Sequence, residues 1–413
     1  MDDDDENDDD LQDEIEERKE RQHFSAILRA FDNYPKWALA NVARVERDYA
    51  VLTQAQQALL GTADKIAQMR RAVNANALVL EKIIGPHREH IGAPEDREDE
   101  RNRTRVLVNR PDGNGTMFMP AERADFVPES DMEKLQSTLK QFVREWGAEG
   151  AAERAAAHNP ALAALQLALP GGAARGDRVL LPGSGLGRMA WECANLGFTA
   201  QGSEFSYFML LAGNFILNAG LADVGSVDVH PWVLQTTNVR CTADQVRACT
   251  VPDTPPWSLP ATSNFSMVAG DFLEVYRDQR ACWEAVLTLF FIDTAHNIAH
   301  YLAAIWTLLT PGGAWVNLGP LLWHFADMPT ETSVDIDWEQ LKLLIVECGF
   351  VLETESWHRC PYVRNIRSMY TMEYDCVCFI ARKPRSAANT PPFGGHPPIP
   401  PPPPGGPPPP PPS

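Results

Sequence analysis

The sequence has no apolar run long enough to cross a membrane. Its longest, at residues 285–292, is far shorter than the roughly 20 residues that a membrane-spanning helix needs. The first residues also lack the basic start and apolar stretch of a signal peptide. We therefore expect a soluble protein with no membrane partner, located in the cytoplasm, with the nucleus as a second compartment.

Paired cysteine spacing is also absent. The eight cysteines are scattered, and Cys376 and Cys378 alternate along an apolar stretch that indicates a strand. Neither a zinc module nor a redox Cys-x-x-Cys motif is indicated. We expect the thiols to be small buried side chains in a reducing compartment, and we expect no metal site.

Positive charge is scarce. The chain carries 36 Lys and Arg against 55 Asp and Glu, a formal net charge of -19, and much of the excess lies in the acidic block Asp2–Glu17. Binding to a phosphate backbone depends on clustered basic side chains. The composition therefore argues against nucleic acid as a partner.

Changes of composition divide the chain into five regions. Residues 1–22 are an acidic tail that we expect to be disordered, 23–87 show helical periodicity interrupted at Pro35, and 88–130 indicate a connector. Residues 131–384 carry a catalytic pattern. The Pro-rich tail 385–413 should adopt polyproline II or stay disordered, and either docks on SH3, WW or profilin-type domains or has no partner.

Short apolar runs alternate with helical stretches through the fourth region. The predicted strands are 179–181, 199–202, 266–269, 285–292 and 314–318, and the predicted helices are 131–157, 187–196, 206–218 and 296–309. Residues 349–354 and 375–381 indicate a closing antiparallel pair. This alternation is typical of a parallel sheet with crossover helices. We expect an α/β fold, a doubly wound Rossmann-like sheet.

A glycine-rich loop, LPGSGLGR, lies between the first predicted strand and the helix that follows it. Gly183, Gly185 and Gly187 let the backbone turn sharply and approach a ligand. A nicotinamide-type fingerprint would have glycine at Arg188. The spacing instead resembles the first motif of class I methyltransferases, whose methyl donor is S-adenosyl-L-methionine.

Acidic residues follow the next two strands. Glu204 lies about 20 residues after the glycine loop, where a carboxylate can bind ribose hydroxyls; alternatively it caps the helix near Ser206. Asp271 with Phe272 suits an adenine amine and ring face. The turn 310–313, TPGG, precedes the fifth predicted strand.

Longer segments are similar to the carnosine N-methyltransferase family. They are LPGSGLGRMAWECANLGFTAQGSEFSYFMLLAGNFILN at 181–218, SNFSMVAGDF at 263–272, FFIDTAHN at 290–297, WVNLGPLLWHF at 315–325 and LKQFVREW at 139–146. The resemblance implies a class I methyltransferase fold and methylation of the imidazole of carnosine, β-alanyl-histidine, to give anserine. It also implies a homodimer through the helical region.

The resemblance also implies site residues. For the cofactor these are Gln141, Arg144, Gly183, Gly185, Glu204, Asp271 and Phe272. For the dipeptide they are Asp293, His324, Tyr362 and Tyr374, with Tyr370 in place of a family tyrosine that is Met372 here. That departure leaves a second hypothesis open, namely another histidine peptide or a protein histidine as substrate. A third is a non-catalytic scaffold that acts through the polyproline tail.

Asp293 is the candidate catalytic residue on physical grounds as well. It follows the fourth predicted strand, and the carboxyl ends of parallel strands face the ligand crevice of such sheets. A carboxylate there can hold an imidazole in the tautomer that leaves the attacking nitrogen unprotonated. His296 and His300 share a helical face, but Asn297 stands where a zinc protease needs Glu, so we interpret that pair as structural.

Overall fold

A computed structural model describes residues 3–91, 106–109, 116–119, 127–219 and 223–387. The chain forms two compact units. The first comprises the residues up to Leu139 together with 230–234 and 245–248, and the second comprises the remainder. Most of the expected Pro-rich tail, 388–413, lies outside the described residues.

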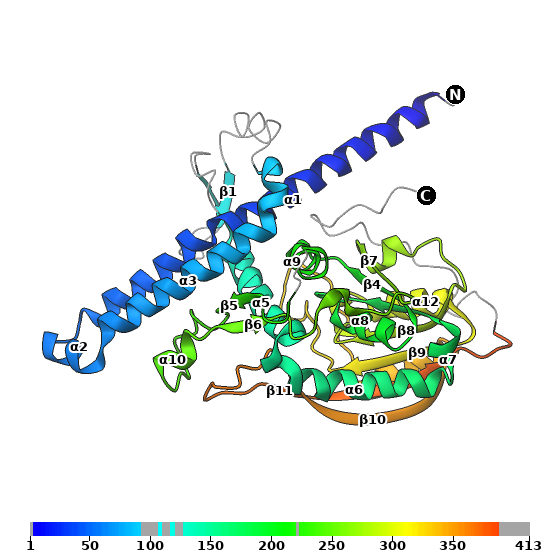
Figure 1. The fold of residues 1–413 in the computed structure, drawn as a ribbon. Coiled ribbons are helices and arrows are strands. Elements are labelled where there is room, and N and C mark those ends of the chain that lie inside the picture. Colours follow the sequence, from blue (N-terminus) through cyan, green and yellow to red (C-terminus); the bar gives the residue numbers. More distant parts are fainter. Residues whose placement is uncertain (1–2, 92–105, 110–115, 120–126, 220–222, 388–413) are drawn as a thin grey trace. The chain divides into compact units, whose positions relative to one another are not determined.

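Two long helices that lie side by side, α1 and α3, form the first unit (Figure 1). Its elements are α1 Asp3–Tyr49, α2 Gln54–Leu60, α3 Thr62–Ile84, η1 Gly85–His90, β1 Val106–Asn109, β2 Thr116–Met119 and the first half of α5 Glu129–Trp146. Leu28, Phe31 and Val42 of α1 and Met69 and Val73 of α3 are buried at helical spacing. No helix in the described part of the chain is both long and apolar enough to span a bilayer.

The structure differs from the sequence-based boundaries in this unit. Helix α1 begins at Asp3 rather than near residue 23. It also continues through Pro35, because tertiary packing of buried neighbours such as Phe31 and Ala38 outweighs one lost backbone bond. The expected connector contains the hairpin of β1 and β2, in which Val106 pairs with Met119.

A seven-stranded sheet organises the second unit. Its order is β10-β11-β9-β8-β3-β4-β7, in which β11 runs antiparallel to both of its neighbours and the pairs from β9 to β7 are all parallel. The bounds are β3 Arg178–Pro182, β4 Thr199–Glu204, β7 Asn264–Ala269, β8 Trp283–Leu289, β9 Leu309–Gly319, β10 Val351–Pro361 and β11 Glu373–Arg382. The predicted α/β fold, a doubly wound Rossmann-like sheet, is confirmed. Because the strand order reverses between β3 and β8, the ligand crevice is expected at their carboxyl ends.

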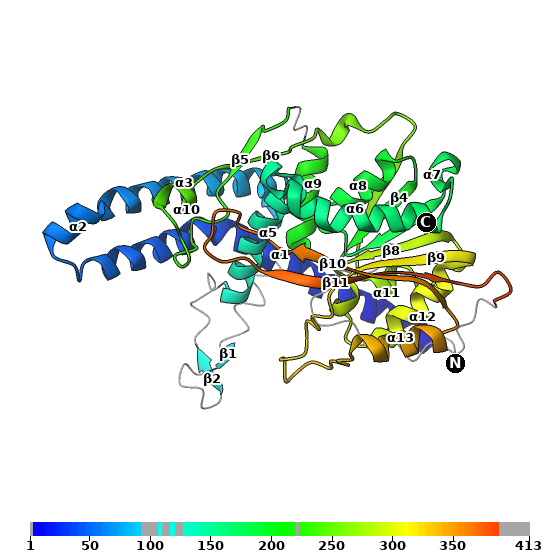
Figure 2. The same ribbon diagram turned by 90° about the horizontal axis from the view of Figure 1, so that it is seen from below.

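Helices cover both faces of this sheet (Figure 2). Helices α6 and α8 pack on one face, and α12 and α13 pack on the other. The remaining bounds are η2 Ala148–Gly150, α6 Ala151–Ala168, α7 Gly172–Arg175, α8 Arg188–Asn195, α9 Tyr207–Asn218, α10 Thr242–Gln245, η3 Pro256–Ser258, α11 Phe272–Val275, η4 Ile292–Thr294, α12 Ile298–Leu308 and α13 Trp338–Glu347. A separate antiparallel pair joins β5 Val227–Val229 to β6 Cys249–Val251.

Several predicted boundaries in the second unit are wrong. The helix expected at 131–157 is divided into α5 and α6 by a tight turn at 147–150, where a Cβ at Gly147 or Gly150 would collide with the backbone of Val143, so the turn requires glycine. Strand β8 ends at Leu289, since Phe290 has a φ of 52° and leaves the extended conformation. The TPGG turn lies inside β9 rather than before it. Helix α13 was not predicted.

Lys383, directly after β11, is fully buried at the end of α12. Its ammonium group donates to the carbonyl oxygens of Trp306 at 2.7 Å and Leu309 at 2.8 Å. Carbonyls at a helix C-terminus have no intrahelical partner, so the ammonium group satisfies them. Burial lowers the pKa of Lys383 to about 8, which still leaves it charged at neutral pH.

Replacing Lys383 with Met should lower the melting temperature by several degrees. Met retains the aliphatic stem but leaves both buried carbonyls unbonded, and bonds from a charged donor contribute about 1.5–3 kcal/mol. Differential scanning calorimetry would measure the change. Lys36→Met, at an exposed position of α1, is the control and should shift the melting temperature little. Equal shifts in the two variants would contradict the capping role.

Candidate active site

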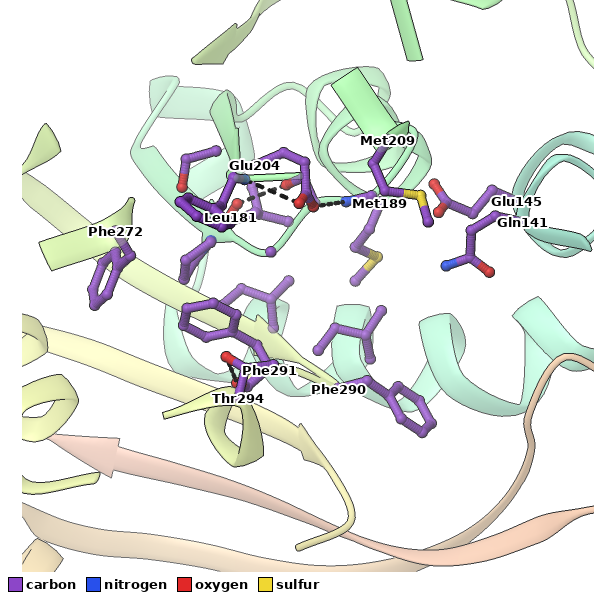
Figure 3. A pocket seen from close by; sticks show the side chains of 18 of the residues that line it. Gln141, Glu145, Leu181, Met189, Glu204, Met209, Phe272, Phe290, Phe291 and Thr294 are labelled. Carbon is purple, nitrogen blue, oxygen red and sulfur yellow. Dashed lines mark hydrogen bonds between the residues drawn. The ribbon is translucent and has the colours of Figure 1, made fainter. Parts of the chain in front are cut away.

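A cavity of about 370 Å³ opens at the carboxyl ends of β3, β4 and β8 (Figure 3). This volume lies within the range of small-molecule sites. The predicted residues that line it are Gln141, Arg144, Gly183, Gly185, Glu204, Asp271, Phe272 and Tyr362. The structure thus brings together every predicted cofactor residue and one predicted substrate residue.

The glycine loop after β3 forms one wall of the cavity. Gly183 and Gly185 have positive φ angles of 67° and 55°. A Cβ at Gly183 would collide with the ring of Phe291, and one at Gly185 would collide with the carboxylate of Glu145. Glycine is therefore required at both positions by backbone conformation and by close approach.

Glu204, at the end of β4, binds this loop directly. Its carboxylate accepts hydrogen bonds from the N–H groups of Gly185 at 2.8 Å, Phe205 at 3.0 Å and Ser206 at 2.8 Å. Burial raises the pKa of Glu204, and these hydrogen bonds oppose the rise. A carboxylate offers about four acceptor positions, so about one remains for a ligand.

Glu145 is a cavity residue that the sequence reasoning missed. It is buried at the end of α5, and its carboxylate accepts hydrogen bonds from the N–H groups of Leu186 at 3.0 Å and Arg188 at 3.3 Å. Burial raises its pKa to about 7, opposed by these bonds and by Arg144 and reinforced by Glu204. Its spacing of four residues from Gln141, on the same helical face, was the available signal.

Arg144 is held by both charge and aromatic contacts. Its Nε lies 3.1 Å from a carboxylate oxygen of Glu153. Its guanidinium carbon lies 4.9 Å from the ring centre of Phe290 and 4.3 Å from that of Tyr362. These contacts fix the side chain at the cavity wall.

Asp271 and Phe272 follow β7, as predicted. Asp271 caps α11 and accepts hydrogen bonds from the N–H groups of Leu273 at 2.8 Å and Glu274 at 3.3 Å, and burial raises its pKa. The Phe272 ring packs edge-on against Phe291, with ring centres 5.6 Å apart. Both residues line the cavity, and their contacts with an adenine remain a prediction.

Asp293 does not end a strand and is not among the side chains that line the cavity. It lies in the 3-10 turn η4, is 3 % exposed, and is flanked by the lining residues Phe291 and Thr294. Its carboxylate accepts a hydrogen bond from the Leu322 N–H at 3.0 Å, and its carbonyl accepts one from the His324 N–H at 3.0 Å. Burial raises the pKa of Asp293, whereas the charge of the exposed His324 side chain opposes the rise.

Two of the three predicted substrate tyrosines lie next to each other, and the third is exposed. Tyr362 and Tyr374 have ring centres 5.9 Å apart, and the Tyr374 hydroxyl donates to the sulfur of Met372 at 3.5 Å. Burial raises the pKa of Tyr374, as do the nearby Tyr362 and Asp293. Tyr370 does not line the cavity and is 57 % exposed, so its role as a substitute phenol stays a prediction.

The histidine pair on α12 and its preceding turn has protein partners. His296 lines the cavity, stacks on Phe325 with ring centres 3.6 Å apart, and its Nδ1 lies 2.9 Å from the Thr332 carbonyl oxygen. His300 lies 3.4 Å from the Asn297 amide. Within the described residues no group of three His, Cys, Asp or Glu side chains could hold a metal ion.

Comparison with known proteins identifies the family. The sequence model described as "Carnosine N-methyltransferase" matches residues 122–385. The carnosine N-methyltransferase of Mus musculus is 40% identical over 378 residues, covering 90% of this chain and 88% of the mouse protein. "Carnosine N-methyltransferase unmet" of Drosophila melanogaster is 34% identical over 383 residues, covering 90% and 81%. The chain belongs to the carnosine N-methyltransferase family.

Membership of this family makes the protein a methyltransferase, and S-adenosyl-L-methionine is its methyl donor. Among solved structures, a Burkholderia thailandensis 1,6-didemethyltoxoflavin-N1-methyltransferase with bound S-adenosylhomocysteine aligns with a TM-score of 0.34 and 17% identity. That alignment covers 61% of this chain and 90% of the other.

Substituting Glu204 tests the cofactor side of the cavity. Glu204→Ala should weaken S-adenosylmethionine binding by about 1.5–3 kcal/mol, because it removes a charged acceptor and releases the Gly185 N–H that shapes the loop. Isothermal titration calorimetry would measure the loss, with Glu347→Ala, at an exposed position of α13, as the control. Unchanged affinity in Glu204→Ala would remove this residue from the site.

Proposed function

We propose that this methyltransferase transfers the methyl group of S-adenosylmethionine to an imidazole nitrogen of carnosine, giving anserine. The observation that carries the proposal is the grouping of Asp293, His324 and Tyr374 next to the cavity wall. Family membership supports the same substrate, because the mouse relative is named for carnosine.

The cavity residues fit the methyl donor. Three features suit a nucleoside joined to an amino acid: the volume of the cavity, the close approach of the glycine loop, and the spare acceptor position on Glu204. Gln141, Arg144, Gly183, Gly185, Glu204, Asp271 and Phe272 would hold it. When bound, it supplies an electrophilic methyl group on a sulfonium. The chain itself supplies orientation and electrostatic complementarity.

Asp293 would act on the accepting imidazole. A carboxylate that accepts the N–H of one ring nitrogen leaves the other nitrogen with a free lone pair for attack on the methyl group. Methylation of a neutral imidazole creates a cation, and the negative charge of Asp293 stabilises it as it forms. The hydrogen bonds that Asp293 accepts from the N–H groups of Leu322 and His324 hold η4 and the loop after β9 in one arrangement.

His324 and the tyrosines would position the dipeptide. His324 is exposed and close to Asp293, which suits a contact with the carboxylate or imidazole of the substrate. Tyr362 forms part of the cavity wall and Tyr374 lies behind it, so the two rings connect the cofactor cavity with Asp293. The Tyr374 hydroxyl donates its hydrogen bond to the sulfur of Met372. That donor is therefore already used and is not offered to a substrate.

Met372 also favours a second candidate substrate. With its hydroxyl bound to sulfur, Tyr374 offers a less polar surface than a free phenol would. A histidine-containing peptide other than carnosine, or a protein histidine, is therefore the alternative acceptor. A panel of imidazole compounds assayed for methyl transfer distinguishes these from carnosine. A purely scaffolding role is disfavoured by the intact cluster of Glu204, Asp271 and Asp293.

We also propose a cellular compartment for the enzyme. All eight cysteines are free thiols, which is typical of a reducing compartment such as the cytoplasm, with the nucleus as a second site. A homodimer is carried over from the family resemblance and stays a prediction. Binding of SH3, WW or profilin-type domains falls on residues outside those described.

Two substitutions separate catalysis from binding. Asp293→Asn keeps the shape and an oxygen that can accept from the Leu322 N–H, but it removes the negative charge. We expect kcat/KM for carnosine to fall by about 100-fold or more, mostly in kcat, because the lost interaction is strongest in the transition state. Steady-state kinetics at saturating S-adenosylmethionine would measure it, with cofactor affinity as the internal control.

His324→Ala is the matched comparison and should mainly raise KM for carnosine, since its assigned role is positioning. Near-normal kcat in Asp293→Asn would end the catalytic assignment. A loss of kcat in His324→Ala as large as in Asp293→Asn would show that the two roles are not separate.

A further inference from the structure

One buried ionisable group of the cavity has no part in the proposed methyl transfer. Glu145 lies at the C-terminal end of α5 and faces the glycine loop after β3. Figure 3 shows its side chain next to Gln141 on the same side of the cavity, near Met209. Gly185 passes so close to the carboxylate that no side chain could be accommodated there.

The Glu145 carboxylate occupies the anion-binding position of this loop. The N-terminus of α8 offers free N–H groups and a partial positive charge, which would ordinarily attract an anionic ligand group. Here the N–H groups of Leu186 and Arg188 already donate to Glu145. A ligand that approaches this wall therefore meets a protein carboxylate rather than open N–H groups.

The surrounding charges leave this part of the cavity negative. Glu204 from β4 lies near Glu145 and raises its pKa, whereas Arg144 on the same helix lowers it. Arg144 is itself paired with Glu153. Arg154 from α6 also interacts electrostatically with Glu145 but pairs with Asp253, as does Arg188. A cationic ligand group is the complement of this arrangement.

We propose that Glu145 binds the α-ammonium group of the methionine part of S-adenosylmethionine. The inference rests on the proposed function, because it takes that donor as the cavity ligand. Three N–H contacts to the two oxygens leave at least one acceptor position. The ammonium group places a positive charge next to the buried carboxylate. Glu145 thereby distinguishes a methyl donor with a free amino group from one without it.

The proposal has a pH consequence that a helix cap alone would not have. Burial places the pKa of Glu145 in the free protein at about 7, so most of the carboxyl groups are protonated at pH 6. Binding an ammonium group requires the ionised form. Affinity for the amino-containing ligand should therefore rise between pH 6 and pH 8, relative to a ligand without the amino group.

The test compares two ligands on the full chain by calorimetry. One is S-adenosylhomocysteine, and the other is its deaminated counterpart, which has hydrogen in place of the amino group. Wild type should bind the first about tenfold or more tightly than the second, as expected for a bond between charged groups. Glu145→Gln should lose most of that ratio while its affinity for the deaminated ligand changes little. Glu347→Gln is the control for loss of an acidic group elsewhere.

Equal losses for both ligands in Glu145→Gln would show a structural cap only and would overturn the proposal. If Glu145→Gln does not fold, the wild-type protein provides the test. The quantity to measure is the ratio of its affinity for S-adenosylhomocysteine to its affinity for the deaminated ligand, between pH 6 and pH 8. A ratio that increases with pH supports the proposal, and a constant ratio overturns it. Absence of S-adenosylhomocysteine binding by wild type would instead refute the proposed function, and the inference with it.

Discussion

The loop between β3 and α8 depends on two buried carboxylates that accept its backbone N–H groups. Glu204 binds Gly185 from the end of β4, and Glu145 binds Leu186 and Arg188 from the end of α5. The loop has no room for side chains at Gly183 and Gly185, so its path is fixed by these acceptors and by Phe291. The shape of the cavity follows from that path.

The same two carboxylates determine the electrostatics of the cavity. Burial raises the pKa of both, and their mutual repulsion adds to the rise for Glu145. A cation bound near them favours the ionised form of both carboxylates, so the site favours a ligand that brings a positive charge to this wall. In the proposed arrangement, the α-ammonium group of the methionine part of S-adenosylmethionine brings that charge.

Sequence reasoning recovered the parts of the site that lie next to strand ends. The glycine loop, Glu204 and Asp271 each follow a short apolar run directly, so the strand pattern placed them at one sheet edge. It missed Glu145, because α5 precedes the sheet in sequence and only the fold brings its end to the loop. It placed Asp293 directly at the end of a strand, whereas the positive φ of Phe290 ends β8 earlier and Asp293 lies in a buried turn. Pro35 was expected to interrupt the helix, but packing keeps α1 continuous through it.

The central claim is that one preformed cavity holds the donor while the group of Asp293, His324 and Tyr374 holds the acceptor. A crystal structure with S-adenosylhomocysteine and carnosine tests it most directly. The account predicts ribose oxygens within hydrogen-bonding distance of Glu204, with the carnosine imidazole bound to Asp293 and one ring nitrogen facing the sulfur. Carnosine bound elsewhere, or a cofactor that displaces the loop from Glu145 and Glu204, would contradict the account.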